Sequence, residues 1–157
     1  MNKKKMLFSS LLMVSVMLSV IFGHVKEVHA GPMAGFDYQN TSHYEARYTR
    51  ALQVMLLNYD EYTQNKIAFN GGADGSFGPA TEKAVKHFQT ATGLTSDGSC
   101  GPATWQKFYT KLQSLGVSGS WVNFTGLYPY ESYSMRHSTG STMTWNSYYY
   151  GYWHYVE

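Results

Sequence analysis

The sequence predicts a mainly α-helical protein, in which a module of three helices is followed by an aromatic-rich C-terminal extension with the capacity to form β-strands. Apolar residues recur every three or four positions in three separate segments, which is the spacing of one helix face. Two of these segments begin with Gly-Pro, and proline is favoured at the first position of a helix. The last 41 residues hold 12 aromatic and only three charged residues, a composition that favours strands.

The first 30 of the 157 residues have the pattern of a secretory signal peptide. Lysines at 3–5 precede an uncharged run of 17 residues at 6–22, and the segment 28–30 places a small residue at each position that a cleavage site requires. The alternative is an uncleaved membrane anchor, but a spanning helix needs ~20 apolar residues. This run is shorter and contains four serines. We expect cleavage after Ala30 and no stable membrane insertion afterwards.

The charge balance excludes further classes of partner. Removal of residues 1–30 takes away four lysines and one glutamate, which leaves eight basic and nine acidic residues and a formal net charge of −1. A nucleic-acid-binding protein needs a basic stripe and a polybasic membrane contact needs clustered cations, and the remaining sequence has neither. The single cysteine, Cys100, excludes a disulfide framework and a cysteine-based zinc site.

The first expected helix follows a short lead. Residues 31–41 contain glycine and proline and are expected to be flexible. Ser42 lies three residues before Glu45, which is the spacing of a capping box. The helix behind this pair should end near residues 58–61. Its apolar face consists of Tyr48, Ala51, Leu52, Met55, Leu56 and Tyr59.

Two further helices each begin at a Gly-Pro pair after a polar loop. The second starts at Pro79 and is expected to stop at Gly93, since a residue with a left-handed backbone suits a helix end. The third starts at Pro102 and is expected to end at Gly116. The apolar positions are Ala80, Ala84, Val85, Phe88 and Ala91 in the second helix and Trp105, Phe108 and Leu112 in the third. Residues 42–115 are therefore assigned to the module and 116–157 to the extension.

An internal repeat links the two loops. Asp-Gly-Ser-Phe-Gly-Pro-Ala-Thr at 74–81 matches Asp-Gly-Ser-Cys-Gly-Pro-Ala-Thr at 97–104 in seven of eight positions. In each copy the Asp side chain can accept from the backbone N–H groups that follow it, and the next glycine supplies a positive φ. Cys100 stands where Phe77 stands in the first copy, so we expect it to be a small buried hydrophobic residue.

The extension differs in composition from the module. Its aromatic residues are interleaved with Ser, Thr, Gly and Asn, while Leu, Ile and Val are scarce. Two or three short strands are plausible. Because the segment lacks the aliphatic residues of an independent core, it must pack on the helices, self-associate or stay loose.

The motifs of the module occur in a fixed order. They are Asp74-Gly75-x-Phe77-Gly78-Pro79-x-Thr81, Ala84-Val85-x-x-Phe88-Gln89, Gly93-Leu94, Asp97-Gly98 and Gly101-Pro102-x-Thr104-Trp105. Over residues 53–112 this order resembles the three-helix peptidoglycan-binding module, type 1, of bacterial cell-wall hydrolases and spore-cortex enzymes. The resemblance implies that a glycan strand or stem peptide of peptidoglycan docks in a shallow groove between the helices and the Asp-Gly loops.

Other uses of these residues fit less well. A calcium loop needs several oxygen ligands at alternating positions and a late Glu, whereas Asp74 is followed by Gly, Ser and Phe. Cys100 and His87 invite a nucleophile–base pair, but the residues that would orient such a base are missing. No two histidines have the spacing of a zinc site. We predict no catalytic residue, no metal and no cofactor, and interpret Trp105 as a core residue.

The candidate ligand-binding residues are Phe69, Asp74, Ser76, Asp97, Tyr149 and Trp153. The first four border the loops at which the resemblance implies the groove. Tyr149 and Trp153 belong to an aromatic cluster beside Asn146 and Ser147, and flat rings with polar neighbours suit contact with sugars. The same cluster equally suits packing of strands on the module or self-association.

These features predict a secreted, non-catalytic protein of a Gram-positive cell wall that binds peptidoglycan and makes no contact with nucleic acid. Two alternatives stay open. One is a self-assembling surface protein that the module tethers to the wall. The other is an accessory subunit of a separately encoded cell-wall hydrolase.

Overall fold

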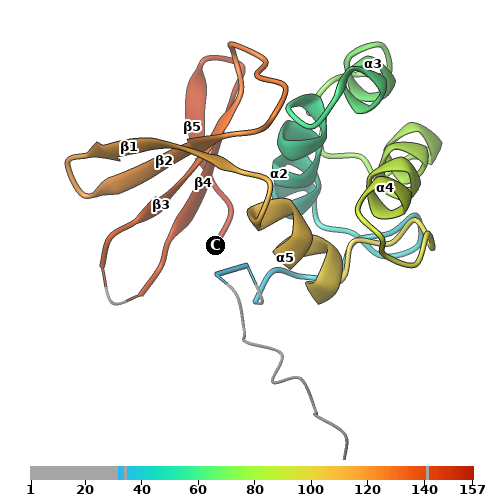
Figure 1. The fold of residues 1–157 in the computed structure, drawn as a ribbon, viewed down its shortest axis with the longest axis horizontal. Helices are drawn as coiled ribbons and strands as arrows, with labels where there is room; N and C mark the ends of the chain where they lie inside the picture. The colour runs from blue at the N-terminus through green and yellow to red at the C-terminus, as the bar shows by residue number, and fades with distance from the viewer. Residues whose placement is uncertain (1–31, 34, 141) are drawn as a thin grey trace, which may run out of the picture.

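The protein has a helical part and a β-sheet that lie side by side (Figure 1). The computed structural model describes residues 32, 33, 35–140 and 142–157, and the predicted signal peptide at 1–30 lies outside them. The described helices are α2 (Ala46–Leu57), α3 (Glu61–Ala68), α4 (Pro79–Ala91) and α5 (Pro102–Tyr109). The described strands are β1 (Gln113–Ser118), β2 (Trp121–Thr125), β3 (Ser134–Ser138), β4 (Trp145–Tyr149) and β5 (Tyr152–Tyr155). Within these ranges no helix is long and apolar enough to span a membrane.

The prediction of a mainly α-helical fold is wrong. The chain after α5 forms a five-stranded antiparallel sheet in the order β1-β2-β3-β4-β5, so each strand pairs with the next along the chain. The last helix ends at Tyr109 rather than Gly116. Gly116 instead lies within β1, next to a register shift, with a φ of 98° that favours glycine.

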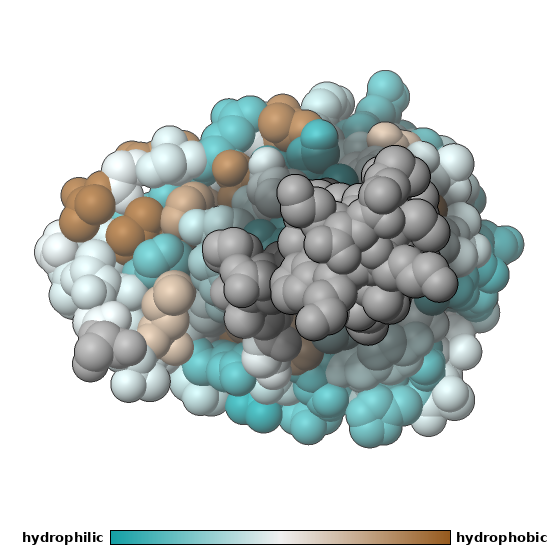
Figure 2. Space-filling view, turned by 60° about the horizontal axis from the view of Figure 1, so that its bottom comes forward, coloured by the Kyte–Doolittle hydropathy of each residue, from teal (hydrophilic) through white to brown (hydrophobic). Residues whose placement is uncertain are grey.

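The sheet turns one face toward the helices. Phe124, Met135, Trp145 and Tyr149 are buried on this inner face, and α2 contacts both β3 and β4. Alternate residues of a strand point to opposite faces, so these side chains face the helices together. Aromatic side chains thus supply most of the buried surface that Leu, Ile and Val supply in other sheets. On the face shown in Figure 2, hydrophobic surface gathers at the sheet end, whereas the helical end is mostly hydrophilic.

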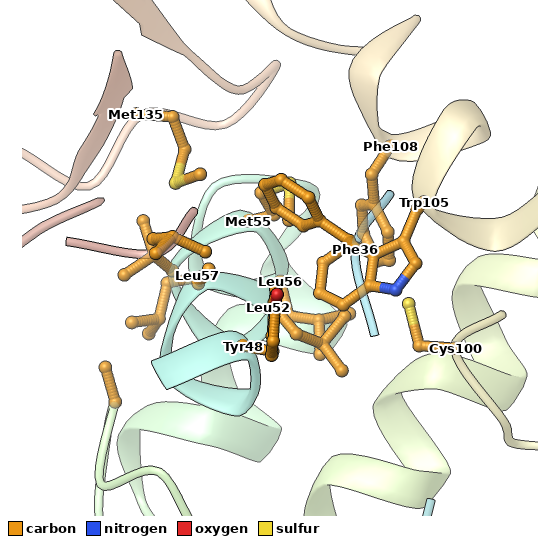
Figure 3. Close-up of a cluster of buried hydrophobic side chains, with 14 of the residues drawn as sticks. Phe36, Tyr48, Leu52, Met55, Leu56, Leu57, Cys100, Trp105, Phe108 and Met135 are labelled. Atoms are coloured by element: carbon orange, nitrogen blue, oxygen red, sulfur yellow. The ribbon is translucent and has the colours of Figure 1, made fainter. Parts of the chain in front are cut away.

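One hydrophobic core joins the helices to the sheet. Leu52 and Leu56 of α2 are fully buried at its centre, and Met135 points from the sheet toward α2 (Figure 3). Trp105 and Cys100 each have a relative exposure of 0%. Both predictions of core positions are therefore confirmed, and burial raises the pKa of the Cys100 thiol well above its usual value.

The described part of the lead packs between the helices and the sheet. Met33 and Phe36 are buried, and the Phe36 ring lies 5.0 Å from that of Trp105 and 5.9 Å from that of Trp145. The Trp145 Nε1 donates to the Pro32 carbonyl at 3.2 Å. Although glycine and proline led us to expect flexibility, these contacts make the lead a bridge between the two parts.

A helix that the sequence analysis missed, α3, follows α2 after three residues. Asp60 and Thr63 form a capping box at its start, since the Thr63 backbone N–H donates to Asp60 Oδ1 at 2.8 Å and the Asp60 N–H donates to Thr63 Oγ1. The expected box at Ser42 and Glu45 is not formed, because Ser42 bonds to Asn40 instead. Asp60 also contacts His87 Nε2 of α4 at 2.7 Å, which attaches α3 to α4.

We expect Asp60→Asn to destabilise the protein at neutral pH and to have little effect in strong acid. Burial alone would raise the pKa of Asp60, but the hydrogen bonds from Thr63 and His87 outweigh it and lower this pKa. The carboxylate therefore stabilises fully above the pKa of about 3.9 of an unfolded Asp, and this contribution is lost as the pH falls through the lower folded pKa. Urea unfolding across this range checks the prediction. Glu61→Gln, on the same helical turn, is the control, and a pH-independent difference between wild type and Asp60→Asn would contradict it.

Candidate functional site

A buried glutamine holds the first Asp-Gly loop in place. The Gln53 side-chain amide of α2 donates to Asp74 Oδ1 at 2.8 Å, to the Ser76 carbonyl at 3.2 Å and to Thr81 Oγ1 at 3.3 Å. Its Oε1 accepts from the Gly75 N–H at 2.9 Å. Because Asp74 Oδ1 also accepts from the Ser76 N–H, this oxygen serves the loop rather than a ligand.

The second Asp-Gly loop is held by a second glutamine in the same way. Gln89 of α4 donates to Asp97 Oδ1 at 2.7 Å, to the Ser99 carbonyl at 2.9 Å and to Thr104 Oγ1 at 3.2 Å, and accepts from the Gly98 N–H at 2.9 Å. The repeat therefore includes a helix upstream of each loop, α2 for the first and α4 for the second, as well as the loop. Sequence reasoning missed this role of both glutamines, although each directly follows a fully buried residue of its helix, Leu52 or Phe88.

A basic residue lies over the glycine of each loop, three positions before the glutamine. A Cβ on Gly75, whose φ is 83°, would come within 2.9 Å of Arg50 Nε, and one on Gly98, whose φ is 78°, would come within 2.8 Å of the Lys86 side chain. The two cations differ in their partners. Lys86 forms an ion pair with Glu82 at 2.6 Å, whereas Arg50 forms none with the described carboxylates.

A groove of about 420 Å³ opens where the first loop meets the hairpin of β4 and β5. It is lined by Arg50, Ala73, Asp74, Tyr149, Tyr150 and His154. Two of the predicted residues, Asp74 and Tyr149, are thus brought together from positions 75 residues apart. Tyr150 belongs to the aromatic cluster that the sequence suggests for sugar contact, whereas sequence reasoning missed Arg50 and His154, which only the packing of α2 and of the hairpin brings to the loop.

Aromatic contacts shape one wall of this groove. The Tyr149 ring stacks on the His154 ring at 3.8 Å, and the Arg50 guanidinium carbon lies 5.9 Å from the Tyr149 ring centre. Burial raises the pKa of Tyr149, and the nearby Arg50 acts in the opposite direction. The Tyr150 hydroxyl donates to the Gly71 carbonyl at 3.2 Å, which ties the hairpin to the loop. The His154 Nε2 is buried without a hydrogen-bond partner among the described residues.

The second loop borders a separate groove of about 240 Å³. Asp97 lies there, beside Tyr38, Leu94 and Pro102. This groove contains no cationic side chain, and no residue of the extension lines it.

The other predicted residues lie outside both grooves. Phe69 is 82% exposed at the end of α3, and Ser76 is exposed in the first loop. Trp153 lies on β5 with the outward-facing residues, so the register places it on the opposite face of the sheet from Tyr149. Among the described residues no group of three or more His, Cys, Asp or Glu side chains could hold a metal ion.

Comparisons with known proteins agree with the architecture of the helical part. The family model of a peptidoglycan binding domain matches residues 48–108, which run from α2 into α5 and exclude the sheet. A zinc D-Ala-D-Ala carboxypeptidase of Streptomyces albus G is 61% identical over 76 residues, which are 48% of this chain and 27% of that protein.

Two further relatives match over 73 and 49 residues. An uncharacterized protein of Kitasatospora aureofaciens is 54% identical over 73 residues, 46% of this chain and 55% of that protein. The N-acetylmuramoyl-L-alanine amidase CwlL of Bacillus licheniformis is 47% identical over 49 residues, 31% of this chain and 14% of the amidase. The chain thus spans about half or less of the length of these relatives. No solved structure matches it significantly. The helical part at residues 48–108 belongs to the peptidoglycan-binding domain family, type 1.

Proposed function

We propose that this chain is a secreted, non-catalytic protein that binds bacterial peptidoglycan in the groove between the first Asp-Gly loop and the β4–β5 hairpin. The family of residues 48–108 supports the class of ligand, and the pattern of residues 1–30 supports export. Two of the relatives are, by name, a D-Ala-D-Ala carboxypeptidase and a muramoyl-alanine amidase, which supports the cell wall as the place of action.

The difference between Arg50 and Lys86 is the reason for placing the ligand in the groove beside the first loop. Both cations lie over a loop glycine, but Lys86 is neutralised by Glu82 at 2.6 Å, while Arg50 reaches the larger groove without an acidic partner among the described residues. A guanidinium with free N–H donors binds carboxylate and carbonyl oxygens well. Asp74 contributes a carboxylate to the same groove. One cation and one anion beside three aromatic rings suit a peptidoglycan stem peptide, which carries charged and apolar groups.

We expect Arg50→Ala to weaken sedimentation of the purified full-length protein with insoluble peptidoglycan by about tenfold or more, as the loss of a charge-assisted hydrogen bond predicts. Lys86→Ala is the matched control, since it removes the equivalent cation of the other repeat and should leave sedimentation nearly unchanged. Analysis of the supernatant for released wall fragments tests the non-catalytic part of the proposal.

Three results would count against this proposal. Equal losses for Arg50→Ala and Lys86→Ala would move the site away from the groove. Failure of the folded wild-type protein to sediment would mean that the family resemblance preserves the fold without the binding. Release of wall fragments by the purified protein would show that it is an enzyme.

A further inference from the structure

The outer face of the sheet carries a transverse row of aromatic and amide side chains. The register places Trp121 of β2, Arg136 of β3, Asn146 and Tyr148 of β4 and Trp153 of β5 on this face, opposite the helices. The proposed groove involves Tyr149 and His154 on the other face, so the two surfaces are separate. Neither the family match, which ends at residue 108, nor the proposed function uses this row.

An arginine is held between two indole rings at the centre of the row. The Arg136 guanidinium carbon lies 4.1 Å from the Trp121 ring centre and 4.0 Å from that of Trp153, which is the geometry of a cation–π contact. The Tyr148 ring is tilted against Trp153 at 5.2 Å. These contacts join side chains of four strands, from β2 to β5, into one continuous surface.

The hydrogen-bonding capacity of Arg136 is only partly used. Its Nε and one Nη both donate to Asn146 Oδ1 at 3.3 Å, although a guanidinium has five N–H donors. No described carboxylate forms an ion pair with it. Partial burial lowers the pKa of Arg136. The row therefore presents fixed, unfilled donors beside flat aromatic surface.

This combination fits a sugar better than the other classes of ligand. Binding sites for small molecules pair apolar and aromatic walls with a few fixed polar groups, and a pyranose offers C–H groups for the rings and oxygens for the donors. Nucleic acid and other polyanions need several cations, whereas this face has one. A second apolar protein surface would not satisfy the free N–H groups of Arg136.

We propose that the outer sheet face at Trp121, Arg136, Tyr148 and Trp153 is a second binding site, which takes an uncharged, N-acetylated glycan. The rings contact the sugar C–H groups and Arg136 donates to an acetamido carbonyl or ring oxygen. This site goes beyond the proposed groove and does not depend on it. Because the two sites do not overlap, a polymer long enough to reach both would bind with higher overall affinity through effective concentration.

The test uses the full-length protein and a soluble β-1,4-linked N-acetylglucosamine hexamer, which lacks any peptide. Trp121 and Trp153 are half-buried, while Trp105 and Trp145 are buried, so the four tryptophans comprise two partly accessible and two buried fluorescence reporters. We expect the hexamer to bind saturably by calorimetry and to protect Trp121 and Trp153 from acrylamide quenching. Arg136→Gln should weaken binding about tenfold, and Trp153→Phe should retain more affinity than Trp153→Ala.

Tyr44→Ala is the control variant, because Tyr44 is 46% exposed on the lead side of α2 and outside both sites. Thermal unfolding of each variant distinguishes a loss of binding from a loss of folding. If Trp153→Ala fails to fold, Arg136→Gln still tests the second site. Absence of hexamer binding to the folded wild type would overturn the second site. So would a loss of hexamer binding in Arg50→Ala with none in Arg136→Gln. If the protein sedimented with whole peptidoglycan but did not bind the hexamer, the second site would be refuted and the proposed function would remain supported.

Discussion

Trp145→Ala is expected to destabilise the whole protein by about 3–5 kcal/mol, the usual cost of removing a buried indole. Trp145 is 1% exposed on the inner face of the sheet, and its ring lies 5.9 Å from Phe36, 6.0 Å from Tyr109 and 6.1 Å from Phe124. It therefore contacts the lead, the helical part and the sheet at once. Urea unfolding followed by helical circular dichroism and by fluorescence checks the result, and both probes should shift together because the core is shared.

The control for this variant is Tyr152→Ala on the other strand of the same hairpin. Tyr152 is 72% exposed, so its removal should change the free energy of unfolding by no more than about 0.5 kcal/mol. Two separate transitions in the Trp145→Ala protein, with the helical signal unchanged, would contradict a shared core. They would show instead that the sheet and the helical part fold independently.

Gln53→Ala is expected to destabilise the protein by about 2–4 kcal/mol, because it leaves several buried or half-buried polar groups without partners. The side chain makes three donor contacts and accepts from the Gly75 N–H, and it is 2% exposed. The matched variant Gln89→Ala removes the same set of bonds from the second loop. We expect losses of similar size, measured as free energies of unfolding in urea.

The control here is Gln64→Ala, a half-exposed glutamine of α3 with no hydrogen bond to the Asp-Gly loops. It should lower the free energy of unfolding by no more than about 0.5 kcal/mol. If Gln53→Ala or Gln89→Ala lowered the free energy of unfolding by no more than Gln64→Ala, the two glutamines would not stabilise the loops. The loops would then be stabilised by their turn residues alone.

Local chemistry explains why the predicted starts of α4 and α5 are correct, although α5 ends at Tyr109 rather than Gly116. Proline at 79 and 102 and the glycines before them act within one helical turn, and apolar residues at three- and four-residue spacing identify the buried face of α4. The missed helix, α3, has only two buried residues. Its weak apolar periodicity could not reveal it, although the Asp60 and Thr63 cap was present in the sequence.

The candidate site was predicted only in fragments. Asp74 and Tyr149 line one groove, Asp97 lines another, and Trp153 lies across the sheet from Tyr149. Period-two alternation separates residues 149 and 153 once the register of β4 and β5 is known. The sequence between them, which includes a turn at 150 and 151, does not reveal that register.

The sequence by itself determined the family of the helical part, the repeated Asp-Gly loops and the buried position of Cys100, because each depends on residues a few positions apart. Only the tertiary structure decided that the extension is a sheet of five strands and that it completes the groove beside Arg50. It also decided that Lys86 forms an ion pair with Glu82, whereas Arg50 forms none with the described carboxylates. The physical reason is that strand pairing and ion pairing join residues distant in sequence, and their partners are set by the shared core rather than by local preference.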